Sequence, residues 1–306
     1  MMIGPALLFA AAALPAGPLD FRARDMRIEP QARRVVLEGD VHLARGDLRV
    51  SGEHAVAEYA KERAAAKAPK RRVRGKPAPE AMLGGQSVER FTVQGNVHVQ
   101  RGARTADGEY GVVDVPAQTL VLTGTPQQPP VVRDGPETLS GERIVLRLDS
   151  EDVDVAHPKL VLRRSVAEEG RASSAVPVKV EADRLVLLQA RRLARFTDGV
   201  ILRRGDAVVR SPRMDARYDA QGQLTHLELR GGVDVRQGDR RATGQTADYD
   251  ARARTLVLQG DPRLYDQGDV LAGERIDLAL DSKEVRVERA RGRLRPEAHK
   301  GEGGAR

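Results

Sequence analysis

The chain has 306 residues and a formal net charge of +7, which leaves room for two domains that each bury a core. Aromatic residues make up 3% of the chain and Trp is absent, which argues against lectin-like surfaces and nucleic-acid stacking platforms. Cysteine is also absent, so neither disulfides nor thiol chemistry is expected.

Residues 1–19, MMIGPALLFAAAALPAGPL, carry no charge, and we interpret them as a signal peptide. The apolar centre, Ala6 to Leu14, is much shorter than the roughly 20 residues that span a bilayer. Small residues near Ala13 and Ala16 are typical of a cleavage site, although no Lys or Arg precedes the apolar centre. The alternatives are a disordered start or a misplaced start codon. The signal peptide predicts export.

From Asp20 onward, short segments alternate apolar and polar residues and are broken by Gly, Asp or Pro, which is typical of antiparallel strands. One pattern recurs, with two alternating apolar residues on each side of a Gly. With a strand period of two, all these positions face one way, and the Gly allows the strand to bend. Bent strands in two facing sheets predict a jelly roll. The pattern occurs at Phe91, Val93, Gly95, Val97 and Val99, and again at Leu227, Leu229, Gly231, Val233 and Val235.

A basic insert lies at about 61–84 and contains Lys70, Arg71, Arg72 and Arg74. Such a segment attracts phosphate or an anionic membrane surface, so these four residues are candidates for contact with an anionic headgroup. The alternative is a solvated extension without a ligand.

Much of the sequence occurs twice, as an internal repeat. GNVHVQRG (95–102) matches GGVDVRQG (231–238), and TLVLTGTP (119–126) matches TLVLQGDP (255–262). LSGERIVLRLDSEDVDV (139–155) matches LAGERIDLALDSKEVRV (271–287). A repeat of this length indicates two copies of one domain. We expect domain 1 at 20–164, a linker at 165–177, domain 2 at 178–294 and a disordered tail at 295–306.

No catalytic motif is found. The histidines show neither metal-ligand spacing nor a neighbouring carboxylate cluster. The repeated Gly-Glu-Arg segments at 141–143 and 273–275 each open a strand after a turn, which favours turn chemistry and a cross-strand ion pair. We therefore expect no enzyme activity, no metal and no cofactor.

The repeated text resembles the OstA-like β-jelly-roll domain of the LptA-like family, which serves periplasmic lipopolysaccharide transport. The resemblance covers about 20–164 and 178–294. It implies an all-β fold of two tandem, open, V-shaped antiparallel jelly rolls whose facing sheets hold lipid acyl chains. The basic insert and the fusion of two domains depart from the family pattern.

The resemblance further implies a periplasmic carrier of lipopolysaccharide or a related glycolipid. Its partners are inner-membrane clamp and outer-membrane translocon components, and head-to-tail self-association is expected. The groove would be lined by the inward apolar residues Leu37, Val41, Val97, Val99, Leu120, Leu122, Ile144 and Leu146 in the first copy, and by Phe196, Leu202, Val233, Val235, Leu256, Leu258, Ile276 and Leu278 in the second.

Two alternatives stay open from the residues alone. The same apolar positions describe the dry core of any β-sandwich. The chain could also be a scaffold that binds partners by adding strands at its sheet edges, or a carrier of another glycolipid or a phospholipid.

Overall fold

The computed structural model describes residues 19–60, 88–163, 167–168, 171–172, 176–279 and 284–293. Within these ranges the only helix is a single 3-10 turn, η1 (Gln189–Arg191), and none is long or apolar enough to cross a bilayer. The predicted all-β, jelly-roll-like fold is confirmed. Nearly all of the predicted signal peptide, the basic insert and the C-terminal tail lie outside the described residues.

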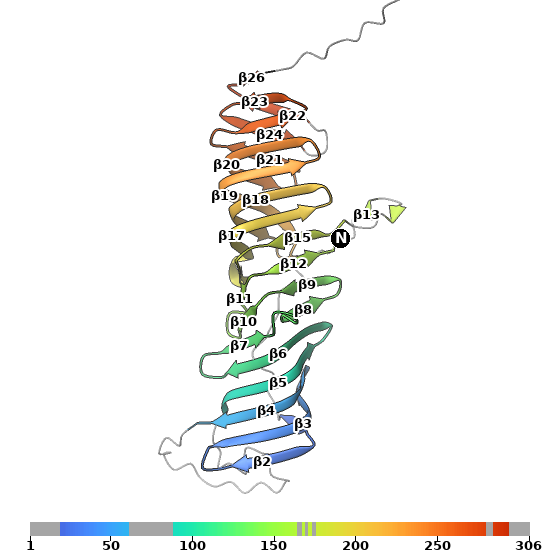
Figure 1. The fold of residues 1–306 in the computed structure, drawn as a ribbon, viewed down its shortest axis with the longest axis vertical. Helices are drawn as coiled ribbons and strands as arrows, with labels where there is room; N and C mark the ends of the chain where they lie inside the picture. Colours follow the sequence, from blue (N-terminus) through green and yellow to red (C-terminus); the bar gives the residue numbers. More distant parts are fainter. Residues whose placement is uncertain are drawn as a thin grey trace, which may run out of the picture.

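The strands stack across the long axis of an elongated molecule, with the first strands at one end and the last at the other (Figure 1). They form one antiparallel sheet of 24 strands, which is bent along its length into two facing walls. The long strands, which cross from one wall to the other, are β3 (Arg34–Arg45), β4 (Leu48–Tyr59), β5 (Val88–Arg101) and β6 (Arg104–Asp114) in the first copy, and β17 (Leu193–Arg204), β18 (Ala207–Tyr218), β19 (Leu224–Gln237) and β20 (Arg240–Asp250) in the second.

The short strands each belong to one wall. Wall one adds β2 (Asp25–Glu29), β7 (Thr119–Thr123), β10 (Arg143–Arg147), β11 (Val153–Ala156), β16 (Arg184–Leu188), β21 (Thr255–Gln259), β24 (Arg275–Ala279) and β25 (Val285–Glu288). Wall two adds β1 (Asp20–Arg22), β8 (Val131–Asp134), β9 (Glu137–Ser140), β12 (Lys159–Leu162), β15 (Val178–Glu181), β22 (Arg263–Asp266), β23 (Asp269–Ala272) and β26 (Arg291–Arg293).

The bends fall where the sequence predicts them. In β5, Gly95 and Asn96 have φ of 75° and 49°, and the pairing with β6 shifts register between Gln94 and Val97. A Cβ on Gly95 would lie 2.8 Å from the Cβ of Glu53, so a larger residue would collide with β4 as well as strain the backbone. The residues on both sides of the bend still face inward.

The two copies join edge to edge without a break in the sheet. In wall one β11 pairs with β16, and in wall two β12 pairs with β15. The sheet is therefore continuous from one copy to the next. Inside the predicted linker, β13 (Ala167–Glu168) pairs with β14 (Arg171–Ala172) as a separate two-stranded sheet. The domain boundaries themselves stay a prediction.

The outer face of wall one holds a buried carboxylate in the second copy. Asp215 lies opposite Arg195 and accepts hydrogen bonds of 3.0 Å from its Nε and Nη2 atoms. Arg213 donates to the same carboxylate at 3.3 and 2.9 Å. Burial alone would raise the pKa of Asp215, but the hydrogen bonds from the two arginines outweigh it and lower that pKa.

We predict that Asp215→Asn lowers the free energy of unfolding at pH 7 by about 2 kcal/mol, because hydrogen bonds to charged groups contribute about that much. A carboxylate with a lowered folded-state pKa stabilises the fold above its unfolded pKa of about 3.9. That stabilisation is lost as the pH falls through the folded pKa. Denaturant titrations at pH 7 and pH 3 should show the difference between wild type and variant shrinking on acidification. Asp239→Asn, at an exposed turn, should change neither value.

Candidate functional site

An apolar seam runs along the whole inner face of the sheet. The cross-strand register places one residue of each strand in line, and almost every member is apolar. In wall one the central line consists of Met26, Leu37, Ala55, Val93, Gly111, Leu122, Ile144, Val155, Leu185, Phe196, Met214, Leu229, Ala247, Leu258, Ile276 and Val287. The seam crosses the junction between the copies without interruption.

All the predicted groove residues lie on this inner face. Most are buried: Leu37, Val41, Val97, Val99, Leu122, Ile144, Leu146, Phe196, Val233, Leu258 and Ile276. The rest pack against the core but are partly exposed: Leu120, Leu202, Val235, Leu256 and Leu278. Sequence reasoning missed the inward residues of β11, β12, β15 and β16, which build the junction. Their alternation, as in Val178-Lys-Val180, was the available signal.

A small apolar cavity lies between the walls of the first copy, with a volume of about 90 Å³. One side is formed by wall one and the other by wall two. It contains five of the predicted groove residues: Val97, Val99, Leu120, Leu122 and Leu146. Five of the predicted groove residues therefore line one cavity. Its volume is smaller than the roughly 300 Å³ of a small ligand pocket.

Comparison of the copies separates the inner face from the outer face. Inside, matched positions keep their apolar character, as in Leu122 and Leu258 or Ile144 and Ile276. At several outer positions they do not: the valines Val36 and Val56 of the first copy are replaced by Arg195 and Asp215 in the second. A property shared by both copies should therefore reside on the inner face.

A pair of charged residues recurs at matched positions of the two copies, where the inner face of wall two ends. Arg104 donates to Asp134 at 2.7 Å, and at the matched place the Arg240 side chain lies 2.8 Å from Asp266. Arg104 and Arg240 lie two residues before the inward alanines Ala106 and Ala242 on the same strands. They therefore face the same side of the sheet and lie at the end of the apolar line. Arg104 also lines the cavity of the first copy. The seam is thus bordered by repeated charged pairs.

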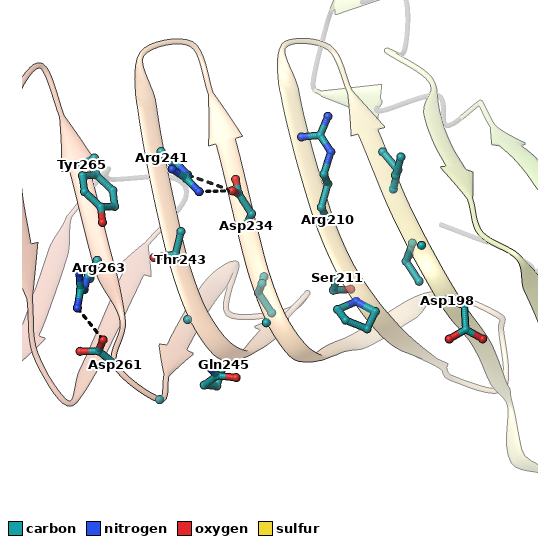
Figure 2. A pocket seen from close by; sticks show the side chains of 18 residues that line it. Asp198, Arg210, Ser211, Asp234, Arg241, Thr243, Gln245, Asp261, Arg263 and Tyr265 are labelled. Carbon is teal, nitrogen blue, oxygen red and sulfur yellow. Dashed lines mark hydrogen bonds and ion pairs between the residues drawn. The ribbon is translucent and has the colours of Figure 1, made fainter.

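A second hollow lies on the outer face of the second copy and has a volume of about 770 Å³ (Figure 2). Arg241 donates to Asp234 at 3.0 and 2.6 Å, and Arg263 donates to Asp261 at 2.9 Å. Burial would raise the pKa of Asp234, but hydrogen bonds from Arg236 and Arg241 outweigh it and lower that pKa.

The charges of this outer hollow largely neutralise one another. The matched positions of Arg210 and Arg241 in the first copy are Ser51 and Thr105, so the hollow is not a shared feature. It therefore takes no part in a function that both copies share.

The Gly-Glu-Arg repeats fit a structural role. A Cβ on Gly141 would lie 2.4 Å from Val155, and one on Gly273 would lie 2.4 Å from a backbone oxygen of β25, so only glycine fits. Glu142 pairs with His157 at 3.1 Å. Within the described part of the chain, no three histidine or acidic side chains gather as metal ligands.

The two ends of the sheet expose side chains whose counterparts in the junction are buried. Met26 is 46% exposed, whereas Leu185, which takes the same place in the second copy, is 0% exposed. At the other end Val285 is 37% exposed, whereas its counterpart Val153 is 1% exposed. Each end of the sheet therefore exposes an edge whose counterpart in the internal junction is covered by a paired strand.

Comparison with known proteins identifies relatives of both copies. The family model described as "LptA/(LptD N-terminal domain) LPS transport protein" matches residues 21–152 and 179–284, one segment in each copy. An uncharacterized protein of Rhizobium meliloti (strain 1021) is 24% identical over 127 residues, which cover 39% of this chain and 68% of that protein.

Among solved structures, the chain is similar to LptH, described as the LptA homologous periplasmic component of the lipopolysaccharide transport device from Pseudomonas aeruginosa. The identity is 18% and the TM-score 0.37, over 40% of this chain and 96% of LptH.

The cavity of the first copy yields a matched pair of predictions. A Cβ on Gly111 would meet Val97 at 3.4 Å and Leu122 at 3.7 Å, which are ordinary contacts. Gly111→Ala should therefore raise the free energy of unfolding by about 0.5–1 kcal/mol. A Cβ on Gly108 would lie 2.8 Å from Leu122, so Gly108→Ala should lower it by about 1–3 kcal/mol. Denaturant unfolding measures the free energy of both variants. The same change in both would mean that Gly111 has no more free space beside it than Gly108 has.

Proposed function

Because this chain belongs to the LptA/LptD N-terminal domain family of lipopolysaccharide transport proteins, we propose that it is a periplasmic bridge protein that carries lipopolysaccharide toward the outer membrane. The lipid A acyl chains would lie between the two walls. The observation that carries this proposal is the continuous apolar seam, which is kept in both copies while the outer faces differ.

The burial pattern supports an interior that opens on one side. Residues next to the bends, such as Val41 and Val233, are almost fully buried. Farther from the bends, Leu120, Val235 and Leu278 keep part of their surface exposed. Each methylene moved from water onto such surface gains about 0.8 kcal/mol, so an acyl chain has a strong drive to enter. Since the cavity is small, the walls must part to admit a chain.

The charged border suits an amphipathic, anionic lipid. Arg104 and Arg240 stand where the seam meets water, at the place where a headgroup would remain when the acyl chains are inside. Guanidinium groups bind phosphate through paired hydrogen bonds. The four basic residues of the insert, Lys70, Arg71, Arg72 and Arg74, are proposed as a second, weaker headgroup contact.

The open edges suit partners of the same fold. Exposed Met26 at one end and Val285 at the other would be covered by strands of neighbouring proteins. We propose inner-membrane clamp and outer-membrane translocon components as those neighbours, with other copies of this chain between them. The same edges favour the second candidate, a scaffold that joins partners by strand addition and carries no lipid.

Lipid capture by a paired set of variants separates a carrier from a scaffold. Val235→Asp places a carboxylate in the partly exposed region of the seam, where it can stay hydrated. We expect the variant to fold but to lose lipid, because an acyl chain would have to desolvate the charge. Val208→Asp, on the outer face opposite Arg203 and Arg236, should keep both properties.

The measurements are thermal melting, together with mass spectrometry of organic-solvent extracts of each purified protein. Unfolding of Val235→Asp beside an intact Val208→Asp would mean a closed core. Wild-type protein free of lipid would favour the scaffold, and recovered phospholipid alone would point to a different cargo.

Salt dependence tests the headgroup contacts. The double variant Arg104→Ser, Arg240→Ser should bind lipopolysaccharide more weakly than wild type and with a smaller loss on raising the salt concentration. The triple variant Arg71→Ser, Arg72→Ser, Arg74→Ser should show the same trend with smaller amplitude and unchanged folding. Binding to lipopolysaccharide vesicles, measured across a salt series, gives both slopes. Unchanged low-salt binding of either variant would remove that group from the contact.

A further inference from the structure

The outer hollow of the second copy is open because two side chains of the first copy have no counterpart there. In the first copy the Asn96 side chain donates a hydrogen bond of 2.8 Å to Glu53, beside the bend glycine Gly95. The matched residues of the second copy are Gly232 and Pro212. A Cβ on Gly232 would meet no atom within 4 Å, so the space that is filled in the first copy is empty in the second.

The charges that line the hollow are balanced. Three aspartates and three arginines contribute to the lining: Asp198, Asp234, Asp261, Arg210, Arg241 and Arg263. Two of the arginines are held by two of the aspartates, as the dashed lines in Figure 2 show. Equal numbers of fixed acids and bases give little net attraction for an anion or a cation. An uncharged polar ligand therefore fits this lining better than a charged one does.

Two charged side chains of the hollow keep free hydrogen-bonding groups. Among the residues that the structure describes, the side chains of Arg210 and Asp198 have no ion-pair or hydrogen-bond partner, and both are exposed (Figure 2). They lie on the neighbouring strands β18 and β17. A guanidinium group only donates hydrogen bonds, and a carboxylate only accepts them. A hydroxyl group does both, so a ligand with several hydroxyl groups can satisfy each of these side chains.

The uncharged side chains of the hollow suit a sugar ring. Thr243 and Gln245 lie two residues apart on β20, and their hydroxyl and amide groups each donate and accept hydrogen bonds. The ring of Tyr265 is held by Arg241, whose guanidinium carbon lies 5.9 Å from the ring centre. A sugar has an apolar C–H face and a hydroxyl-bearing edge, so it can contact this ring and the polar groups together. The low aromatic content excludes a broad stacking surface, but one sugar needs only one ring.

The matched groups of the first copy are already bonded to one another. Asp107 takes the place of Thr243, and its carboxylate lies 2.6 Å from His98 and is bonded to Arg133. The hydroxyl of Thr243 has no such partner within the described residues. The second copy therefore lacks both the side chains that fill the bend and the bonds that engage the polar groups beside it.

We propose that the outer hollow of the second copy binds a short, uncharged segment of an oligosaccharide. Its volume of about 770 Å³ lies within the roughly 300–1,000 Å³ of small-molecule sites. The hollow is open to solvent, so a segment within a longer glycan chain can lie across it. It lies on the outer face of the sheet, so this ligand is separate from the lipid that we propose for the seam.

Filling the hollow with the residues of the first copy tests the site. The double variant Pro212→Glu, Gly232→Asn restores the pair that Glu53 and Asn96 form. Asn accepts a positive φ, which is 100° at Gly232, more readily than most residues do. We expect this variant to bind maltotriose and chitotriose at least about tenfold more weakly than wild type in isothermal titration calorimetry. Thermal melting checks that it is folded.

Single substitutions test the two free groups without filling the hollow. Arg210→Ser and Asp198→Gly copy Ser51 and Gly39 of the first copy. Each removes hydrogen bonds to the sugar, so each should weaken binding about tenfold. The melting temperature should not change, because neither side chain has a partner within the described residues. Arg203→Ser, on the same outer face but outside the hollow, is the control and should bind like wild type.

Four results would overturn the proposal. Wild type could fail to bind either trisaccharide at millimolar concentration, or the double variant and Arg210→Ser could both bind like wild type. Glycylglycine that binds more tightly than both sugars would assign the hollow to a zwitterionic ligand. Lipopolysaccharide vesicles that displace the trisaccharide would make the hollow part of the cargo site. Lipid capture by Arg210→Ser should equal that of wild type, so failure of the carrier and failure of this site are told apart.

Discussion

Strand alternation combined with an unbroken cross-strand register is the constraint on which the rest of the structure depends. Every strand puts alternate residues inside, and every ladder aligns those residues with the ones before and after. A slip of one residue in any ladder would turn charged residues such as Arg195 inward and their apolar neighbours outward. The apolar seam, the charged pairs that border it and the open edges of the sheet all depend on this shared register.

The bends explain why one sheet can enclose its own interior. At Gly95 and Asn96 the backbone has left-handed φ angles, and these two residues are left out of the pairing between β5 and β6. The same set of residues faces inward before and after the bend. The same left-handed backbone angles recur in alternate long strands, β3, β5, β17 and β19, so the walls remain face to face over both copies. The bent sheet needs no second sheet to cover its apolar side.

The sequence predicted the fold class and the inward residues of the long strands, because alternation around a bend glycine is a local signal. It did not identify which strands form the junction, since pairing of β11 with β16 depends on segments that meet only after folding. The run Val35-Val36-Leu37 carries no alternation in polarity, so nothing in it signalled that the outward residue, Val36, is also buried. Arg104 and Arg240 went unnoticed because isolated surface charges are common. Their identical place in both copies was the signal that could have found them.

Because the strands lie across the long axis, the length of the molecule is a count of strands and does not depend on how long each strand is. In the described part of the chain each wall contains sixteen strands, and at about 4.8 Å per step they span roughly 70 Å. The number of domain copies therefore sets the length of the molecule. A further copy would add eight strands to each wall, or about 38 Å, and would leave the cross-section unchanged. A single polypeptide can in this way replace two separately associating molecules over the same distance. The step between its halves is then covalent and independent of protein concentration.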